Sequence, residues 1–343
     1  MRIGLVAPPW IPVPPPAYGG TEAIVDTLAR GFAAAGHDVL LAAASGSTCP
    51  VPKVPGPPAT DGSKIGDGLD ELRHSVFAFE AMEDVDVIHD HTLSGPLYRH
   101  RPGSIPIAAT AHLPFSDDNF SSIYRAMAAD TALIAISHHQ ADSAPGIKIR
   151  KVIHHGIDTG SVPIGAGDGG YASFLGRMHP GKGLPEAIEA ARLAQVPLRI
   201  AAKMYSAEEH EYYSTVVAPL LGPDVEYLGE LNSTEKFVFL GGSIALINPI
   251  QWSEPFGMAM IEALATGTPV VSTPRASAPE IVSDGVTGYL RSTPAELAKG
   301  LLAAAGLDRR ECRLAAETYF SAARMVSEHL ALYEELLGEP TPA

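Results

Sequence analysis

The sequence predicts an α/β protein of two doubly wound domains, each a parallel sheet covered by helices, facing each other across a cleft. Short apolar runs alternate with helix-like segments along most of the chain, which is the pattern of strands joined by crossover helices. The length of 343 residues exceeds what one hydrophobic core usually supports. A glycine-rich, polar stretch at 156–170 separates two such series, so we expect the domain linker there.

The first series begins with a buried strand rather than a secretory signal, because its apolar run is short. A helix is expected at 20–35, with apolar residues on one stripe and a stop at Gly36. The proline-dense stretches 8–16 and 51–58 are expected to be loops. Strands are expected at 2–7, 38–44, 85–90, 104–110 and 131–137.

The second series repeats this alternation, and helices are expected at 184–194 and from about Pro255 onward. The remainder, 294–337, is expected to contain helices only. Strands are expected at 171–176, 197–202, 225–229, 243–248 and 269–272.

These segments divide the chain into three parts. We expect an N-terminal domain over 1–160, a C-terminal domain over 171–320 and a final helix within 321–343. Ligands of open parallel sheets bind beyond the carboxyl ends of the strands, so we expect the functional residues in the loops that follow them.

Composition excludes several classes of function. Hydrophobic residues make up 46% and charged residues 18% of the chain, a globular balance. The net charge of −15 argues against nucleic acid and anionic lipid as partners. A phosphate ligand must therefore be held by a few local cations and by backbone. No apolar run is long enough to span a membrane, and the distant Cys49 and Cys312 suggest a reducing cytoplasm.

The segment "SFLGRMHPGKGLPEAI" (173–188) places two cations on one strand-to-helix loop. Arg177 offers a planar fork and Lys182 a point charge, a combination that suits a diphosphate. The same spacing also fits two solvated surface cations, which the chain's modest number of basic residues disfavours.

The stretch "SEPFGMAMIEALATGTPVVS" (253–272) contains two carboxylates, Glu254 and Glu262. If a helix starts at Pro255, the amides of Phe256, Gly257 and Met258 face a ligand at its positive end. Glu254 then lies just outside the helix, and Glu262 about two turns in. Carboxylates accept hydrogen bonds from sugar or ribose diols; two solvated charges fit the spacing equally well.

Weaker signals lie in the first domain. Gly19 and Gly20 precede a helix, where bare backbone amides bind an anion or simply form a turn. His112 follows a strand, so it either lines a pocket or caps the strand. The many histidines lack metal-ligand spacing, and "DVD" (84–86) precedes a strand, so we expect no metal site.

Several segments carry a family resemblance in order along the chain. They are "YGGTE" (18–22), "DVIHDH" (86–91), "ATAH" (109–112), "HHGID" (154–158), "GRMHPGKG" (176–183), "EPFGMAMIEALATGTPVV" (254–271) and "APEIVSDGVTGYL" (278–290). Together they resemble the retaining glycosyltransferases of family four, whose GT-B fold has two Rossmann-like domains. The last two segments are the most specific. The chain departs from the family at Lys203, where a Gly-x-Gly turn is usual, and it is short for the family.

The resemblance implies roles for the candidate residues. Glu262 would hold the ribose hydroxyls of a nucleotide, and Arg177 and Lys182 would bind its diphosphate, helped by the amides of Gly19 and Gly20.

In the same family pattern, Glu254 and the amides of Phe256, Gly257 and Met258 would face the donor sugar. His112 would contact that sugar from the N-terminal domain, which would otherwise shape the acceptor site. The C-terminal helix would cross back to this domain.

The resemblance also implies a reaction. A sugar would move from a nucleoside-diphosphate donor, UDP by family habit, to a hydroxyl of a carbohydrate or natural-product acceptor, without a metal and by same-face displacement. The alanine-, glycine- and proline-rich composition would suit antibiotic biosynthesis. A nucleotide-sugar epimerase, an inverting transferase or a non-catalytic sugar-nucleotide binding protein are the alternatives. Acceptor, sugar and oligomeric state stay open.

Overall fold

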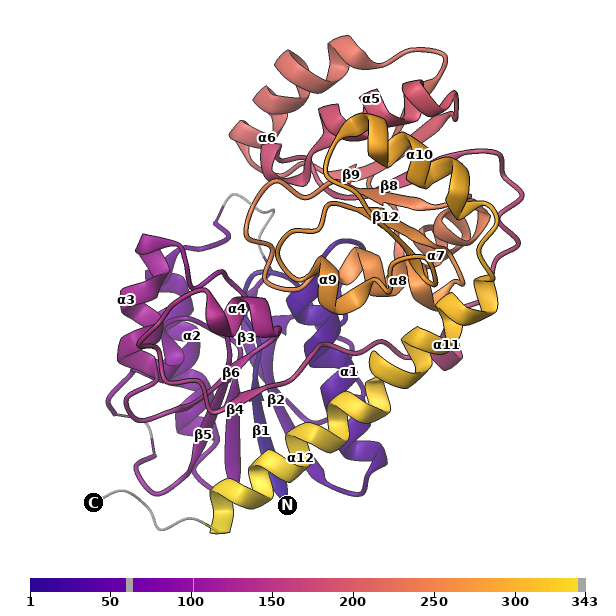
Figure 1. Cartoon of the computed structure of the whole chain (residues 1–343). Helices are drawn as coiled ribbons and strands as arrows, with labels where there is room; N and C mark the ends of the chain where they lie inside the picture. Colours follow the sequence, from indigo (N-terminus) through magenta and orange to yellow (C-terminus); the bar gives the residue numbers. More distant parts are fainter. Residues whose placement is uncertain (60–63, 101, 339–343) are drawn as a thin grey trace. The chain divides into compact units, whose positions relative to one another are not determined.

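The computed structural model describes residues 1–59, 64–100 and 102–338, which form two compact units (Figure 1). Unit 1 consists of the described residues of Met1–Gly156 together with the last helix, α12 (Ala322–Gly338). Unit 2 is Ile157–Ser321. Residues 339–343, at the end of the expected C-terminal helix range, lie outside the described residues. Among the described helices, none has both the length and the apolar character needed to cross a bilayer.

Unit 1 is built on a parallel sheet of seven strands in the order β3-β2-β1-β4-β5-β6-β7. The order reverses at β1, so the carboxyl ends of β1 and β4 flank the switch point at which doubly wound folds bind ligands. The strands are β1 (Arg2–Val6), β2 (Asp38–Ser45), β3 (Lys53–Pro58), β4 (Val87–Asp90), β5 (Ile107–Thr110), β6 (Ala132–Ala135) and β7 (Lys151–Val152).

Helices cover this sheet because each one turns an apolar stripe toward it. The core beneath α2 joins Val6, Phe79 and Ile88, and a second cluster beneath α3 joins Tyr124 and Leu133. Helix α12 packs against α1 (Figure 1). The helices are α1 (Gly20–Ala34), α2 (Gly68–Ala81), the short η1 (Gly95–Leu97), α3 (Asp118–Met127), α4 (His138–Asp142) and, at the start of unit 2, η2 (Thr159–Ser161).

Unit 2 is built on a parallel sheet of six strands in the order β10-β9-β8-β11-β12-β13. The chain winds outward from β8 to β10 and then returns to the other side of β8, so this switch point lies between β8 and β11. The strands are β8 (Ala172–Arg177), β9 (Leu198–Lys203), β10 (Val225–Gly229), β11 (Leu246–Asn248), β12 (Val270–Ser272) and β13 (Gly288–Leu290).

Helices α5 and α10 pack together over the core that contains Phe174, Ile200 and Leu301. Helix α8 packs against β11, β12, α7 and α11. After η2, the helices of unit 2 are η3 (Pro180–Lys182), α5 (Leu184–Ala194), α6 (Ala207–Tyr212), η4 (Tyr213–Val217), η5 (Ala218–Leu220), α7 (Ser233–Gly242), α8 (Met258–Ala265), α9 (Ala278–Ile281), α10 (Pro294–Ala304) and α11 (Arg309–Tyr319).

The predicted fold class of two doubly wound parallel-sheet domains is confirmed, and each predicted strand is present. The prediction of a loop at 51–58 is wrong, because β3 forms there. Proline is tolerated at this place since β3 is the edge strand, so an amide that faces solvent is dispensable. The two-residue β7 and the three-residue β13 were not predicted.

Candidate active site

The loop after β8 lies against the segment that follows β11. Arg177 ends β8, and Lys182 ends the short helix η3. Gly183 has φ +72, and a Cβ at this position would lie 2.0 Å from the carbonyl oxygen of Pro249. Only glycine fits that approach. The backbone therefore brings Lys182 to the end of β11, at the switch point of the sheet.

Lys182 meets Glu254, one of the two carboxylates singled out in the sequence. The Lys182 Nζ lies 2.5 Å from Glu254 Oε2, and the indole Nε1–H of Trp252 donates to the same oxygen over 2.7 Å. The Lys182 and Glu254 side chains are only 14% and 12% exposed. Solvent screens such a pair little, so the two charges interact strongly. The alternative interpretation, a solvated surface cation, is therefore wrong for Lys182.

Glu262 is held by a cation that sequence reasoning missed. Lys236, on α7, places its Nζ 2.7 Å from Glu262 Oε1, and both side chains are largely buried. Lys236 lies 26 residues before its partner, and the sequence around it offers no local signal of the pairing. Glu262 is thus a fixed carboxylate rather than a solvated helix charge.

The helix carrying Glu262 starts later than predicted. Gly257, with φ +105, is the N-cap of α8, which begins at Met258. Pro255 therefore lies in the preceding loop, since a left-handed residue interrupts any helix between the two. Glu262 lies about one turn into the helix instead of two. The side chain of Phe256 is buried, and its carbonyl accepts a hydrogen bond from the Ser277 hydroxyl.

Arg177 shares a carboxylate with Lys203. Glu209 Oε1 lies 3.5 Å from Arg177 Nε and 3.2 Å from Lys203 Nζ. Arg177 and Lys203 are register partners at the carboxyl ends of β8 and β9. Burial lowers the pKa of Lys203, and the Glu209 carboxylate acts in the opposite direction.

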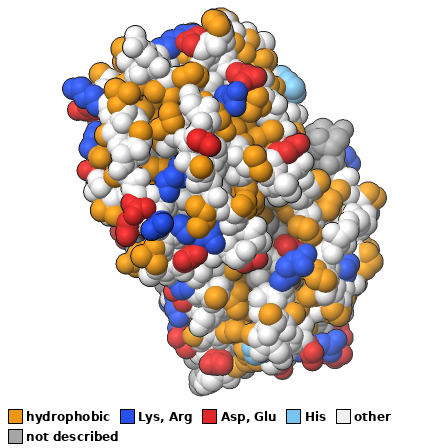
Figure 2. Space-filling view, turned by 90° about the vertical axis from the view of Figure 1, so that its right-hand side faces the viewer, with side chains coloured by type: hydrophobic (Ala, Val, Ile, Leu, Met, Phe, Trp, Pro, Cys, Tyr) orange, Lys and Arg blue, Asp and Glu red, His pale blue; other side chains and the backbone are white. Residues whose placement is uncertain are grey.

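His179 lies between the two predicted diphosphate cations and senses both. Its pKa is lowered first by burial and then by the charges of Arg177 and Lys182, while Glu209 and Glu254 raise it. These groups therefore share one electrostatic neighbourhood. Four cations and three carboxylates of unit 2 form its ion pairs: Lys182 with Glu254, Lys236 with Glu262, and Arg177 and Lys203 with Glu209. Figure 2 shows basic and acidic side chains interspersed over the visible face.

In unit 1, Gly19 and Gly20 stand at the start of α1, where the chain returns from the loop after β1. Gly19 is the N-cap, and a Cβ there would lie 2.6 Å from the Pro15 side chain. Glu22, in the first turn of α1, is buried, and burial raises its pKa to about 7. The sequence motif contained this carboxyl group, but nothing in the pattern distinguished it from an ordinary helix-start acid.

His112 belongs to a buried cluster of imidazoles, the histidine cluster of unit 1. Its Nε2 lies 2.9 Å from Nδ1 of His91. Burial lowers the pKa of every member, for His112 and His329 to about 4, so the cluster is uncharged at neutral pH. His112 contacts His91 and His155, so the alternative in which it simply caps the preceding strand does not describe its surroundings. The cluster consists of His89, His91, His112, His155 and His329.

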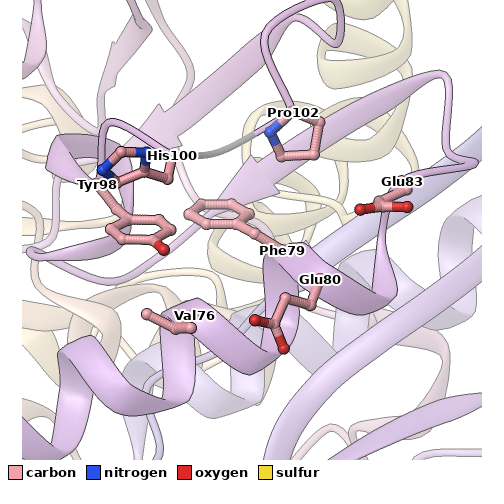
Figure 3. Close-up of a pocket in the computed structure, with 7 residues that line it drawn as sticks. All are labelled: Val76, Phe79, Glu80, Glu83, Tyr98, His100 and Pro102. Atoms are coloured by element: carbon pink, nitrogen blue, oxygen red, sulfur yellow. The ribbon is translucent and has the colours of Figure 1, made fainter.

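A separate hollow of about 300 Å³ opens in unit 1 beside α2 (Figure 3). The aromatic rings of Phe79 and Tyr98 stack there, and Glu80 and Glu83 stand at its side. The lining residues of α2 precede the start of β4, and the lining residues from Tyr98 to Pro102 precede the start of β5. The hollow therefore lies at the amino edge of the sheet, away from the strand ends that carry the candidate residues.

The structure thus brings the predicted residues of unit 2 to one edge of its sheet. Those of unit 1 lie at the carboxyl ends of β1 and β5. The first group consists of Arg177, Lys182, Glu254, Phe256, Gly257, Met258 and Glu262, and the second of Gly19, Gly20 and His112.

Comparison with known proteins agrees with this architecture. The family model described as Glycosyltransferase Family 4 matches residues 18–161, and the model described as Glycosyl transferases group 1 matches residues 165–315. A phosphatidyl-myo-inositol mannosyltransferase of Mycolicibacterium smegmatis is 26% identical over 339 residues, covering 89% of this chain and 83% of the relative. A D-inositol 3-phosphate glycosyltransferase of Mycobacterium leprae is 32% identical over 190 residues, covering 47% of this chain and 40% of that enzyme.

Solved structures show the same fold. AviGT4, a glycosyltransferase involved in avilamycin A biosynthesis, has a TM-score of 0.76 and 24% identity, covering 99% of this chain and 98% of its own. Anabaena Alr3699/HepE, crystallised with UDP and glucose, has a TM-score of 0.77 and 17% identity over 97% of this chain and 99% of its own. With a family model on each half and this fold, the chain belongs to the family-four glycosyltransferases of the GT-B fold.

Proposed function

We propose that this glycosyltransferase moves a sugar from a UDP-sugar to an acceptor hydroxyl, with retention of the anomeric configuration and without a metal ion. The observation that carries the proposal is the convergence of Arg177, Lys182, Glu254 and Glu262 at the switch point of unit 2. The two cations match the anionic diphosphate at the centre of a nucleotide sugar. The two carboxylates match the hydroxyl groups on either side of it, on the ribose and on the donor sugar.

In this proposal, Arg177 and Lys182 bind the diphosphate, and the amides of Gly19 and Gly20 assist. Charge grows on the leaving diphosphate as the sugar bond breaks, so cations fixed in advance lower the barrier where that charge appears. They also supply the positive charge that a metal ion provides in other enzymes. Glu262, held in place by Lys236, accepts hydrogen bonds from the ribose hydroxyls.

Glu254 faces the donor sugar, together with the amides of Phe256, Gly257 and Met258 at the start of α8. The N-terminus of α8 favours developing negative charge nearby. His112 offers a neutral imidazole to a sugar hydroxyl. We propose same-face attack, in which the leaving phosphate accepts the proton of the acceptor hydroxyl, because the family pattern supplies no carboxylate for a double displacement.

We assign the acceptor side to unit 1 and the acceptor to a carbohydrate or natural product. The similarity to AviGT4, whose role is in avilamycin A biosynthesis, supports an acceptor from antibiotic biosynthesis. The two cysteines are buried and unpaired, which supports a cytoplasmic enzyme.

A panel of nucleoside diphosphates tests the donor class. UDP, GDP, dTDP and ADP are each added to the protein with EDTA, and the melting temperature is measured. A ligand at 100 times its Kd stabilises the folded state by ~2.7 kcal/mol, so we expect a clear shift with UDP and little with uridine. No shift with any of the four would contradict the proposal, and a shift only with Mg²⁺ would remove its metal independence.

Stereochemistry tests the reaction. Turnover of the UDP-sugar that the panel supports, with a simple sugar acceptor, is followed by NMR of the anomeric proton. Retention is expected; an inverted anomer in the first product would show an inverting transferase instead.

A further inference from the structure

Lys203 lies beside the proposed diphosphate cations but has no role in the reaction described above. It ends β9, next to the end of β8, and its side chain is only 9% exposed. Its ammonium shares one oxygen of Glu209 with the guanidinium of Arg177, as the distances of 3.2 and 3.5 Å show. Burying an ammonium is costly. Lys203 is therefore not an ordinary solvated lysine of the surface, and its position needs another explanation.

Glu209 cannot move away from the two cations without losing other contacts. Its Oε2 accepts the backbone amides of Tyr205, over 2.7 Å, and Ser206, over 3.3 Å. It also closes a capping box with Ser206 at the start of α6, an arrangement that fixes the helix start. The carboxylate is therefore a permanent neighbour of Arg177.

A permanent carboxylate is a liability for a guanidinium that must bind an anion. Alone, Glu209 would neutralise Arg177 and repel a diphosphate approaching it. With Lys203 present, Arg177, Glu209 and Lys203 together carry a formal charge of +1. The carboxylate of Glu230 also acts on Lys203, and every variant below keeps it. Arg177, which is 34% exposed, is the member most open to a ligand.

We infer that Lys203 is a positioning residue: it satisfies Glu209, so that the Arg177 guanidinium stays available to an anionic diphosphate. This inference rests on the proposed function. It gives a purpose to the residue at which the chain departs from the Gly-x-Gly turn usual in its family.

Charge-balanced variants test it, with UDP and inorganic pyrophosphate as probes and calorimetry at low salt as the measurement. Lys203→Met leaves Arg177 neutralised, so we expect the Kd for both probes to rise by about tenfold, the scale of one nearby unit charge. Lys203→Arg keeps the charge and should bind like the natural protein. Arg199→Met removes a charge from the other end of β9, where Arg199 pairs with exposed Glu226, and should leave both Kd values unchanged.

The decisive variant is the double substitution. Glu209→Gln removes the negative charge but keeps a side chain that can close the capping box. In Lys203→Met/Glu209→Gln the formal charge summed over positions 177, 203 and 209 is again +1, so we expect affinity to return to within about threefold of the natural protein. Glu209→Gln alone should bind both probes more tightly than the natural protein.

The outcomes distinguish failure of the Lys203 inference from failure of the proposed function. Natural-like binding by Lys203→Met overturns it, and so does a double variant as weak as Lys203→Met, which would mean that Lys203 contacts the ligand itself. If Lys203→Met does not fold, an unchanged Kd for Glu209→Gln overturns it equally well. Failure of the natural protein to bind UDP or pyrophosphate at all would instead remove the proposed function.

Discussion

The two sheets have the same doubly wound plan, but the polar groups at their carboxyl edges differ in kind. Unit 2 carries ion pairs in which Lys182, Lys236 and Arg177 each meet a carboxylate. Unit 1 carries the histidine cluster, whose imidazoles are uncharged at neutral pH because burial lowers their pKa. In the proposed function, the edge of unit 2 receives the anionic diphosphate and the histidine cluster of unit 1 faces neutral hydroxyl groups.

Under the proposed function, this contrast gives a common fold two separate tasks. The strand order alone makes two pairs of loops equivalent. The loops after β1 and β4 flank the switch point of unit 1, and the loops after β8 and β11 flank that of unit 2. The side chains then decide what each position can bind, because formal charge attracts a diphosphate while neutral donors and acceptors suit sugars. Changing the charge at each edge should therefore have unlike consequences.

The largest effect is expected from Lys182→Ala. Turnover with saturating donor should fall by an equivalent of roughly 2–4 kcal/mol, the scale of one preorganised donor to developing charge. The assay is initial-rate kinetics with the UDP-sugar in excess. Lys299→Ala, which removes an exposed lysine from α10, is the matched control. Near-normal turnover in Lys182→Ala would remove the lysine from the mechanism.

The second prediction concerns acid and the other edge. His329, on α12, has a folded-state pKa of about 4, lowered chiefly by burial and further by Arg324 and Lys151, while its hydrogen bond to the Met325 carbonyl raises it. The unfolded imidazole titrates near 6.5, so this contribution to stability is complete above that pH and is lost as the pH falls toward 4. The loss should be about 2 kcal/mol between pH 7 and 5.

His329→Phe should therefore lose less stability over that range than the natural chain. Trp10 lies in unit 1 and Trp252 in unit 2, so urea unfolding followed by Trp10 fluorescence in a Trp252→Phe background reports on unit 1. Glu22, with its raised pKa of about 7, changes the stability with pH in the opposite direction. Because Glu22 is present in both proteins, its effect cancels when their pH dependences are compared. His210→Gln, at an exposed position on α6, is the control. Equal pH dependence in all three proteins would contradict the assignment.

The same comparison shows what the sequence could predict. Strand positions such as β10 and helix bounds such as α5 follow from local apolar periodicity, which is why they were predicted well. The edge strand β3 was missed because three of its six residues are prolines, which interrupt the apolar pattern. Gly257 displaced the start of α8, since a left-handed φ is a property of one residue that no period reveals.

The candidate acids and cations were found from their loops, but their partners were not. Lys182 and Glu254 are 72 residues apart, and Lys236 and Glu262 are 26 apart. Such pairs arise only when crossover helices return neighbouring strands to one edge. Glu209 was invisible for the same reason, because its significance depends on the register of β8 and β9.

The smallest effect is expected from Glu262→Gln, which tests whether this carboxylate recognises ribose. The amide keeps the shape but weakens hydrogen bonds to the two hydroxyls, so UDP affinity should fall about tenfold, the scale of one charged hydrogen bond. The sharper readout is the ratio of Kd values for UDP and its 2′,3′-dideoxy analogue, which should approach one in the variant. Glu311→Gln, on an exposed position of α11, should preserve the natural ratio. If Glu262→Gln preserves it as well, the carboxylate serves only to hold Lys236, and ribose recognition lies elsewhere.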